Sequence, residues 1–377
     1  MLKGFYLTLM IGPAIPIPVP QFVMDALTGV QITNTAAPHS PSGFSLTFTA
    51  GSNSPLHSLF LISGGGMFPL MRVVLMVTVN GIPDVLIDGV ITKQDIGPSN
   101  EIGQSTLTIT GVDLTAVMDL IDFSGVPYPA MPSEARVALI LAKYMLFGIV
   151  PLIIPSILID VPNPLEKFPV HQGTDFAYLN ELADRVGYVF YISPGPVPGV
   201  SIAYWGPQIK IGVPQPALNI NMDAQTNVES MSFGIDTESK TLPVVYAYVK
   251  EAHLTIPIPI PDISPLNPPL GLIPPLPKRI QFMKDTAKLT PIQAVLIGLA
   301  RASKTSDVVR GSGSLDVLRY GRVLKARQLV GVRGVGIAFD GLYFVQSVTH
   351  NIKHGEYKQS FSLTRNGLVS TLPKVPV

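Results

Sequence analysis

Two alternating runs near the end of the chain place the tightest constraint on its fold. Large or apolar side chains recur at every second position of Leu342–Thr349 and of Tyr357–Thr364, and a polar loop that contains Gly355 separates the runs. Runs of period two joined in this way predict an antiparallel hairpin. Because the alternate positions are polar, we expect a sheet with one buried and one wet face, as in a barrel wall or a sandwich. The predicted buried face of the second run carries Tyr357, Gln359, Phe361 and Leu363.

The first third of the chain carries similar strand signals. Strands are predicted at Phe44–Phe48, Arg72–Val79, Val85–Thr92 and Ser105–Thr110. Asn80-Gly81 is a typical hairpin turn between the second and the third of these strands, and Gly89 predicts a β-bulge. Short antiparallel strands joined by turns favour a small barrel or sandwich. We therefore assign residues 1–123 to a first β-barrel domain.

Helical signals dominate the middle of the chain. One helical stretch is predicted over residues 133–148. A second helix has Thr174 as its N-cap and ends at Gly187, and a strand follows over Tyr188–Ile192. Two helices and a strand in this order predict an α+β domain, which we place at residues 124–215.

Residues 216–377 are predicted to form a second β-barrel domain that ends in the hairpin. A proline-rich insertion at residues 253–279 interrupts its strands. Such a composition favours polyproline II and lacks the N–H donors that a central strand requires. A passive loop is one interpretation, but solvated linkers are rarely apolar, so we predict that this insertion contacts a partner. The apolar residues expected to make that contact are Ile256, Ile258, Ile260, Leu266, Leu270, Leu272, Ile273 and Leu276.

A further helix and a basic stretch follow the insertion. The helix is predicted to begin near Pro291, a residue favoured in the first turn. Arginines then recur between Arg301 and Arg333. No aromatic residues alternate with them as they do in single-stranded nucleic-acid sites. We expect a solvated rim or a contact with an acidic partner.

The chain is poor in charge for its length. Of its 377 residues 14% are charged and 47% are hydrophobic, and the formal net charge is +1. The surfaces of free soluble monomers usually carry about 25 to 35% charged residues, so we expect partners to cover much of the surface of this chain. The alternative is a large core beneath a surface rich in uncharged polar residues. Neither nucleic acid nor an anionic membrane is a predicted partner, because no global field attracts them.

No stable membrane insertion is predicted. The apolar segment at residues 1–20 is broken by prolines, so we expect a first strand there rather than a signal peptide. Tyr144–Leu158 carries no charge, but it contains Pro151 and Pro155. It is also shorter than the roughly 20 residues that a spanning helix needs. A buried or partner-covered segment is the prediction for this stretch.

Residues that carry chemistry are few. The absence of cysteine excludes disulfides, thiolate metal sites and a cysteine nucleophile. Gly64-Gly65-Gly66 lacks the Lys and Ser/Thr of a phosphate-binding loop. His350 and His354 are the only histidines close in sequence, and no third metal ligand accompanies them. Without a hydrolase or metalloprotease motif, we predict no enzyme activity, no metal and no cofactor.

Three longer phrases are spread along the chain. They are TLTITGVDLTAVMD (106–119), GTDFAYLNELADRVGYVFYI (173–192) and GVGIAFDGLYFVQSVTHNIKHGEYKQSFSLTRNG (334–367). In this order and spacing they resemble the late control protein D family of contractile-tailed phages and the related hub region of spike proteins in contractile injection systems. None of the phrases is a catalytic motif, so the resemblance rests on pattern.

The resemblance implies two small antiparallel β-barrels joined by an α+β region, in a β-rich α+β chain. Three copies form a homotrimer in such hubs, and their six barrels imitate sixfold symmetry. A hub of this kind seats the hexameric inner tube protein on one side, carries the spike on the other and contacts other baseplate proteins. After Leu368 only VSTLPKVPV remains, which leaves no room for an OB-fold or a needle, so a separate spike protein is implied.

The implied function is therefore structural: a baseplate hub, assembled in the bacterial cytoplasm as part of a tail, a virion or an extracellular injection particle. The sequence leaves open whether that particle is a phage tail, a secretion apparatus or a free device. Two alternatives are a tail-associated peptidoglycan hydrolase and a cell-surface binding module. The hydrolase would need a cleft with paired carboxylates of shifted pKa.

Overall fold

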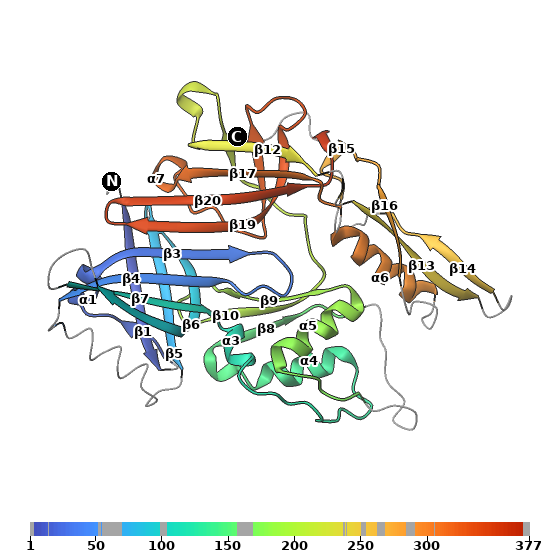
Figure 1. The fold of residues 1–377 in the computed structure, drawn as a ribbon, viewed down its shortest axis with the longest axis horizontal. Helices are drawn as coiled ribbons and strands as arrows, with labels where there is room; N and C mark the ends of the chain where they lie inside the picture. Colours follow the sequence, from blue (N-terminus) through green and yellow to red (C-terminus); the bar gives the residue numbers. More distant parts are fainter. Residues whose placement is uncertain are drawn as a thin grey trace.

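The computed structural model describes residues 4–13, 15–51, 54, 70–98, 104–156, 169–236, 238, 240–249, 254–261, 268–283, 291–304 and 306–371. Figure 1 shows three regions in this part of the chain: one large sheet, a group of helices with short strands below it, and an arm at one end. Strands outnumber helices, so the prediction of a β-rich α+β fold is confirmed.

The large sheet draws on both ends of the sequence. From the first third it takes β1 (Phe5–Pro13), β2 (Ile17–Pro18), β3 (Leu27–Thr35), β4 (Gly43–Gly51), β5 (Met71–Val79), β6 (Ile82–Pro98) and β7 (Gln104–Asp113). From residues 215–365 it takes β11 (Gln215–Asn219), β12 (Ser230–Ile235), β17 (Val309–Asp316), β18 (Leu329–Arg333), β19 (Gly341–Lys353) and β20 (Glu356–Arg365). The strand order is β12-β17-β20-β19-β3-β4-β7-β6-β5-β1-β2, with β18 on β19 and β11 on β18.

The predicted hairpin is confirmed as β19 and β20. The two strands pair antiparallel from Phe344 and Thr364 down to the turn, where Gly355 has φ +76°. The predicted inner face is fully buried, since Tyr357, Gln359 and Leu363 are 0% exposed. The pairing skips one residue between Val345 and Ser347, so a bulge at Gln346 shifts the alternation of β19.

The prediction of two closed barrels needs correction, because the described strand pairings form one continuous sheet. The outer edge of β3 pairs with β19, from Thr35 opposite Ser347 to Gly29 opposite Lys353. The outer edge of β1 pairs with β2. Both edges of the β1–β7 half are thus occupied, and in the described part of the chain this half does not close on itself. A single core runs through both halves, from Leu9 and Phe48 to Tyr343 and Leu363.

Gly89 has a role different from the predicted one. The bulges of β6 lie at Leu86 and Thr92, where its pairing with β5 and β7 shifts register. Gly89 instead lies where the neighbouring strand comes too close for a side chain. A Cβ atom at this position would stand 2.2 Å from the carbonyl oxygen of Val112.

The helical region holds α3 (Thr115–Met118), α4 (Ser133–Ala142), the 3₁₀ turn η1 (Met145–Phe147), α5 (Asp175–Val186) and the short strands β8 (Ile149–Ile153), β9 (Val189–Pro194) and β10 (Ser201–Gly206). The remaining short helices are α1 (Gln21–Ala26), η2 (Asp223–Gln225) and α7 (Val317–Tyr320). As predicted, Thr174 caps α5 by accepting a hydrogen bond from the Ala177 amide, and Gly187 ends it in the left-handed region. None of the helices in these described ranges is long and apolar enough to cross a membrane.

A buried ion pair joins the helical region to the large sheet. Arg72 donates from Nε and Nη2 to both oxygens of Asp88, at 2.7 and 2.6 Å. Ser201 also donates to Asp88, and Arg72 donates to the carbonyl of Gly199. Strands β5 and β6 are therefore fixed to the start of β10.

The arm consists of β13 (Thr241–Val249), β14 (Leu254–Pro259), β16 (Arg279–Phe282) and α6 (Pro291–Lys304). Its three strands form a separate sheet in the order β14-β13-β16, and α6 packs on that sheet through Val245, Ile260, Ala294 and Ala302. Pro291 opens α6 as predicted. Between β14 and β16 the chain returns to the body, where β15 (Gly271–Ile273) pairs with β21 (Leu368–Ser370).

The polyproline II prediction for residues 253–279 is wrong where the structure describes them as strands. In β14 the prolines occupy alternate positions, Pro257 and Pro259, and Ile260 donates its amide to the carbonyl of Pro243. The missing N–H groups therefore face away from β13. This spacing makes β14 an edge strand, which is where a sheet tolerates proline.

Candidate functional site

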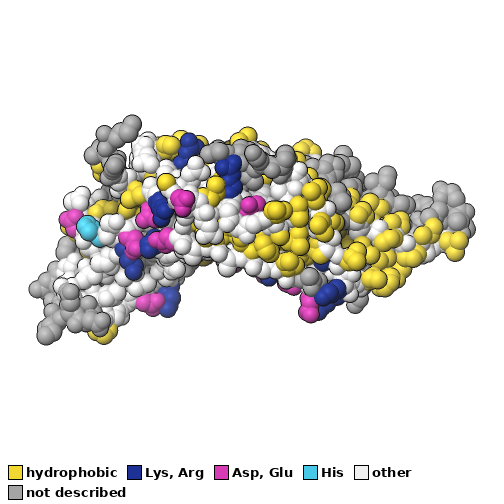
Figure 2. Space-filling model, turned by 90° about the horizontal axis from the view of Figure 1, so that it is seen from above, with side chains coloured by type: hydrophobic (Ala, Val, Ile, Leu, Met, Phe, Trp, Pro, Cys, Tyr) yellow, Lys and Arg dark blue, Asp and Glu magenta, His cyan; other side chains and the backbone are white. Residues whose placement is uncertain are grey.

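The arm presents an apolar surface. Figure 2 shows hydrophobic side chains gathered over the end of the molecule that carries the arm, while charged side chains gather over the other half of the same face. Ile280 and Phe282 of β16 are 63% and 57% exposed, and Leu254 of β14 is 61% exposed. Residues 254–261 and 268–283 contain two basic residues and no acidic one.

The arm sheet has one covered and one open face. Val245 and Ile258 lie opposite each other on the face that packs against α6. The other face carries Tyr246 and Phe282, whose rings stack 5.9 Å apart. No described helix covers this second face, because α6 packs on the first.

The residues predicted to contact a partner divide into anchors and exposed groups. Ile260 and Leu270 are buried, at 2% and 6% exposure, and Ile258 packs against the core of the arm. Leu270 holds the segment to the body, because its amide donates to Asn366 at 2.8 Å. The exposed members are Ile256, Leu272, Ile273 and Leu276, which is 84% exposed. Leu266 lies outside the described residues.

A second apolar surface lies on the helical region. It is formed by Leu139 of α4, Met145 and Leu146 of η1, and Val150 and Leu152 of β8, and Leu146 is 91% exposed. The uncharged stretch 144–158 was predicted to be buried or covered by a partner. In its described part Tyr144 and Ile149 are buried, whereas Met145, Leu146, Val150 and Leu152 are exposed in the single chain. The η1 turn between α4 and Gly148 was not apparent in the sequence.

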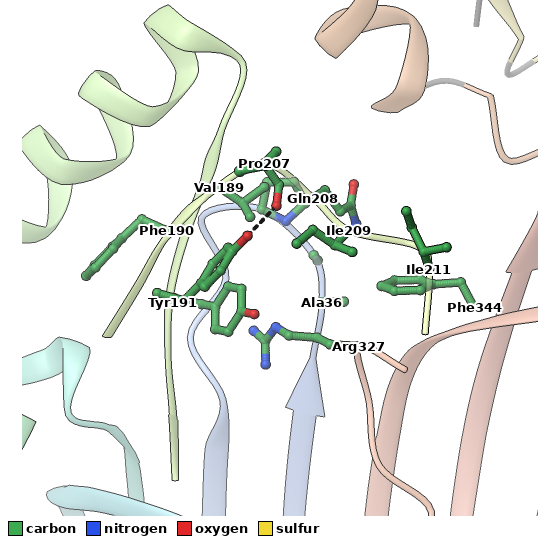
Figure 3. A pocket seen from close by; sticks show the side chains of 13 residues that line it. Ala36, Val189, Phe190, Tyr191, Pro207, Gln208, Ile209, Ile211, Arg327 and Phe344 are labelled. Atoms are coloured by element: carbon green, nitrogen blue, oxygen red, sulfur yellow. Dashed lines mark hydrogen bonds between the residues drawn. The ribbon is translucent and has the colours of Figure 1, made fainter. Parts of the chain in front are cut away.

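The arginines between Arg301 and Arg333 lie in different surroundings. Arg310 pairs with Asp236 at 3.3 Å, and Arg319 is exposed. Arg327 lies in the wall of a cavity of about 180 Å³ between β9, the loop after β10 and the body of the large sheet (Figure 3). Its guanidinium carbon stands 4.0 Å from the centre of the Tyr191 ring. This cavity was not predicted.

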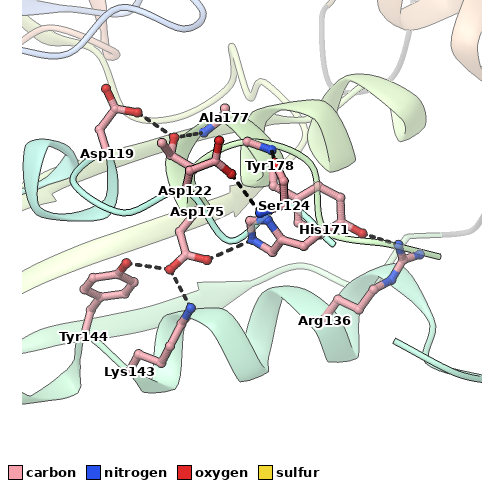
Figure 4. Close-up of polar contacts among 12 residues, drawn as sticks. Asp119, Asp122, Ser124, Arg136, Lys143, Tyr144, His171, Asp175, Ala177 and Tyr178 are labelled. Carbon is pink, nitrogen blue, oxygen red and sulfur yellow. Dashed lines mark hydrogen bonds and ion pairs between the residues drawn. The ribbon is translucent and has the colours of Figure 1, made fainter. Parts of the chain in front are cut away.

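A buried polar network ties α4 and α5 together (Figure 4). Asp175 is 0% exposed and receives contacts from three side chains. Tyr144 donates to its Oδ2 at 2.5 Å, Lys143 pairs with the same oxygen at 2.6 Å, and His171 Nε2 lies 2.9 Å from Oδ1. Burial, followed by the hydrogen bond to Asp175, raises the pKa of Tyr144. The network holds the two helices in register and has no cavity beside it among those described.

His350 and His354, the two histidines close in sequence, do not converge on a site. His350 is buried in the core, where its Nδ1 lies 2.8 Å from the Tyr357 hydroxyl, and His354 is exposed in the turn. In the part of the chain that the structure describes, no group of three or more His, Asp or Glu side chains is arranged to hold a metal ion. The candidate functional features are thus the two apolar surfaces and the cavity beside Arg327.

Comparison with solved structures identifies proteins of the same fold. A tail protein from Neisseria meningitidis is 14% identical, with a TM-score of 0.61, over 97% of this chain and 98% of its own. A 43 kDa tail protein of prophage MuSo2 from Shewanella oneidensis is 14% identical, with a TM-score of 0.60, over 96% of this chain and 99% of its own. A chain of the Francisella PdpA-VgrG complex is 8% identical, with a TM-score of 0.59, over 100% of this chain and 55% of its own. No protein-family model and no curated protein matches the sequence.

Proposed function

We propose that this chain is a structural subunit of a phage tail or of a related contractile injection machine, where it forms the hub of the baseplate. The observation that carries this proposal is the fold, which two tail proteins share over nearly the whole of their length and of this chain. A chain of the Francisella PdpA-VgrG complex has the same fold. The activity is mechanical and rests on shape and self-association.

The proposed hub is a homotrimer. A ring of identical subunits needs two different surfaces that meet head to tail. The arm and the surface around Leu146 are two such surfaces, both apolar and both exposed in the single chain. Residues 253–279 contact a neighbouring chain in this proposal, through Ile256, Leu272, Ile273 and Leu276. The low charged fraction of 14% fits a chain whose surface is largely covered in the assembly.

Each subunit contributes two β-rich parts to the ring. The proposed divisions are residues 1–123, residues 216–377 and the α+β part at 124–215 between them. Three copies then present six β-rich parts, which gives a threefold spike and a hexameric inner tube a common platform. We assign the tube to one face of this platform and a separate spike chain, with other baseplate proteins, to the other.

The first test is to image particles from a strain that lacks this chain. A hub is required to begin assembly, so we expect negative-stain images without baseplates or tubes. If particles assemble normally and only fail to infect or inject, the chain is an enzyme or a receptor-binding module instead.

The second test is the mass of the purified chain in solution. The expected mass is three times 40.4 kDa, with the chain at the concentration used for assembly. A monomer in isolation together with one copy per assembled particle would overturn the trimer.

A further inference from the structure

Arg327 adopts a backbone conformation that its residue type rarely adopts. It lies in the loop between α7 and β18, with φ +64°. A residue other than glycine in the left-handed region carries strain of about 1 kcal/mol or more, and such residues recur where a binding site requires a fixed geometry. The Arg327 amide donates to the carbonyl of Val345 at 2.9 Å. This bond holds the strained backbone against β19.

The guanidinium group of Arg327 is held in place by aromatic rings. It stacks on Tyr191, whose ring in turn stacks on that of Tyr204 with centres 5.0 Å apart. The Tyr204 hydroxyl donates to the carbonyl of Pro207 at 2.7 Å, which fixes the far end of the stack. A guanidinium placed over the face of a ring makes a cation–π contact that uses none of its N–H groups as hydrogen-bond donors. The orientation of the donors is therefore set in advance.

These donors have no acceptor within the described part of the chain. No hydrogen bond and no ion pair joins the Arg327 side chain to another residue there, and its contact is the Tyr191 ring. Three cations that are more deeply buried than the half-buried Arg327 do have acceptors. Arg72 pairs with Asp88 and Lys210 with Asp307, and Arg365 donates to three backbone carbonyls. Burial lowers the pKa of Arg327, because solvent compensates its charge poorly.

The acidic groups that face this region are already engaged. Asp113 accepts hydrogen bonds from the amides of Ser42 and Thr115, at 2.7 and 3.0 Å, and burial raises the pKa of its carboxyl. Asp84 pairs with Lys325. Both carboxyl groups line a second cavity of about 460 Å³ that shares Tyr191 and Arg327 with the first. Arg327 thus lies between two cavities. Asp113 is close enough to interact with its charge, but no carboxyl group in the described part of the chain forms a hydrogen bond with it.

Most of the residues that line the smaller cavity are apolar, although polar atoms contribute about as much of its surface as apolar atoms do. Figure 3 shows Val189, Ile209, Ile211 and Phe344 around it, with Gln208 as a polar side chain near its rim. A free inorganic anion is poorly suited to such walls, since it would be desolvated without gaining enough hydrogen bonds. An apolar group attached to the anion would fill the cavity.

We propose that this cavity binds a carboxylate carried on an apolar stem, with the carboxylate on Arg327 and the stem between Ile209, Ile211 and Phe344. Charge-assisted, bidentate hydrogen bonds of this kind are the strongest that a guanidinium forms. Two sources supply this chemistry: a small fatty carboxylate, or an acidic side chain or carboxyl terminus of a neighbouring polypeptide. The second source rests on the proposed function, and the experiments below separate the two.

The first experiment measures binding of small probes to the full-length chain by calorimetry. We expect hexanoate to bind. Hexanol and inorganic phosphate should bind at least tenfold more weakly, because hexanol lacks the carboxylate and phosphate lacks the apolar stem. Arg327→Gln should weaken hexanoate binding at least tenfold. Arg319→Gln, a change at an exposed arginine, should leave it unchanged.

A second variant guards against loss of folding in Arg327→Gln. Gln208→Glu adds a carboxylate of nearly the same shape to the cavity wall. We expect it to weaken hexanoate binding severalfold without lowering the melting temperature, because a negative charge at the rim of the cavity repels the carboxylate of hexanoate. If hexanol binds as well as hexanoate, or if both cavity variants bind hexanoate like the unaltered chain, the proposal is wrong.

The source of the carboxylate is tested with phenylglyoxal, which modifies arginine side chains. Hexanoate should protect Arg327 in the dialysed free chain, as read by peptide mass spectrometry. Protection of Arg327 in assembled particles without hexanoate would assign the carboxylate to a neighbouring polypeptide. Equal modification in particles and in the free chain would assign the site to a small, exchangeable carboxylate. The calorimetry needs no assembled particle, so it stands if the proposed function fails.

Discussion

Asp175 is the buried carboxylate on which α4 and α5 depend. Its oxygens make polar contacts with Lys143, Tyr144 and His171 at distances between 2.5 and 2.9 Å. A buried acceptor that serves several donors matters more than any single bond, because its loss leaves all of them unpaired. The helix cap at Thr174 and the stop at Gly187 place this residue in the first turn of α5.

We expect Asp175→Asn to lower the free energy of unfolding by about 2 to 3 kcal/mol. This is less than for a fully buried pair, because Lys143 is 42% exposed and can be solvated. Urea denaturation measures the loss. Glu181→Gln on the same helix removes an exposed ion pair with Arg185 and should cost less than about 0.5 kcal/mol. If the Asp175→Asn chain is as stable as the unaltered one, the network does not contribute to the stability of the fold.

His350 should make stability depend on pH. Burial lowers its pKa from 6.5 to about 3, so between these two pH values the imidazole is protonated in the unfolded chain and neutral in the folded chain. Stability from this group is therefore complete above pH 6.5 and is lost as the pH falls toward 3, by about 1.4 kcal/mol per pH unit. Denaturation experiments between pH 6.5 and 4 measure how the free energy of unfolding changes with pH. We expect this slope to be smaller by that amount in His350→Gln. His354→Gln, an exposed neighbour, should keep the full slope.

At the scale of single residues, features set by local sequence patterns could be predicted, whereas contacts between residues far apart in the sequence could not. Alternation predicted the buried positions of β20, and residue type predicted the ends of α5. His350 was not predicted to be a core residue, because the bulge at Gln346 shifts which side chains of β19 point inward. The contact of Arg327 with the Tyr191 ring joins residues far apart in the sequence, and no local sequence pattern predicts it.

At the scale of elements, proline spacing decides the structure of the arm. The composition of residues 253–279 predicted a segment without strand pairing. The alternate positions of Pro257 and Pro259 permit pairing on one side only. A rule based on composition overlooks this, whereas a rule based on parity would have found an edge strand. The apolar character of the segment was predicted correctly, but not its division into buried anchors and exposed groups.

Gly89→Ala tests the close approach of β6 to its neighbour. The added methyl group would meet backbone atoms of Val112 and Asp113, which have little room to move. We expect a loss of about 1 to 3 kcal/mol or more, as for other overpacked positions. Gly97→Ala in the same strand meets nothing within 4 Å and is the matched control. Equal melting temperatures for the two variants would contradict the close approach.

Ile280→Ser combined with Phe282→Ser tests the arm. Both side chains are more than half exposed, so we expect the isolated chain to lose no more than about 1 kcal/mol, mainly from the Tyr246 stack. Particle yield should fall sharply, because the proposed contact with a neighbouring chain loses its apolar groups. Ile96→Ser, a change at a residue that is 57% exposed on β6, should leave the yield unchanged. Normal particles from the double variant would exclude this surface as a contact.

At the scale of the whole molecule, one pairing turns two predicted bodies into a single sheet. Thr33 of β3 and Thr349 of β19 are 316 positions apart and share a hydroxyl hydrogen bond of 3.1 Å. The sequence predicted most strands of the first half and the final hairpin of the second half, but not β3 or the other strands of the second half. It did not predict the joining of the halves, because the edge that a strand offers to a distant partner leaves no periodic signal in either segment.

Ile32→Ala tests whether the two halves unfold together. Ile32 is 0% exposed and lies opposite His350 on β19, and such a truncation costs about 2 to 5 kcal/mol. We expect hydrogen exchange to accelerate in β17 and β20 as well as in β3 and β4. Gln31→Ala, at the exposed neighbouring position, should change neither. Acceleration confined to β1–β7 would mean that the halves open independently.

The β3–β19 ladder also determines how this molecule carries a mechanical load. A tether of flexible chain between the halves would stretch before it transmitted any pull. Here every residue from Ser347 to Lys353 has a partner on β3, so tension along these strands strains all the rungs at once, whereas tension across them opens the rungs one after another. The protein is accordingly stiff in one direction and weak in the direction at right angles to it.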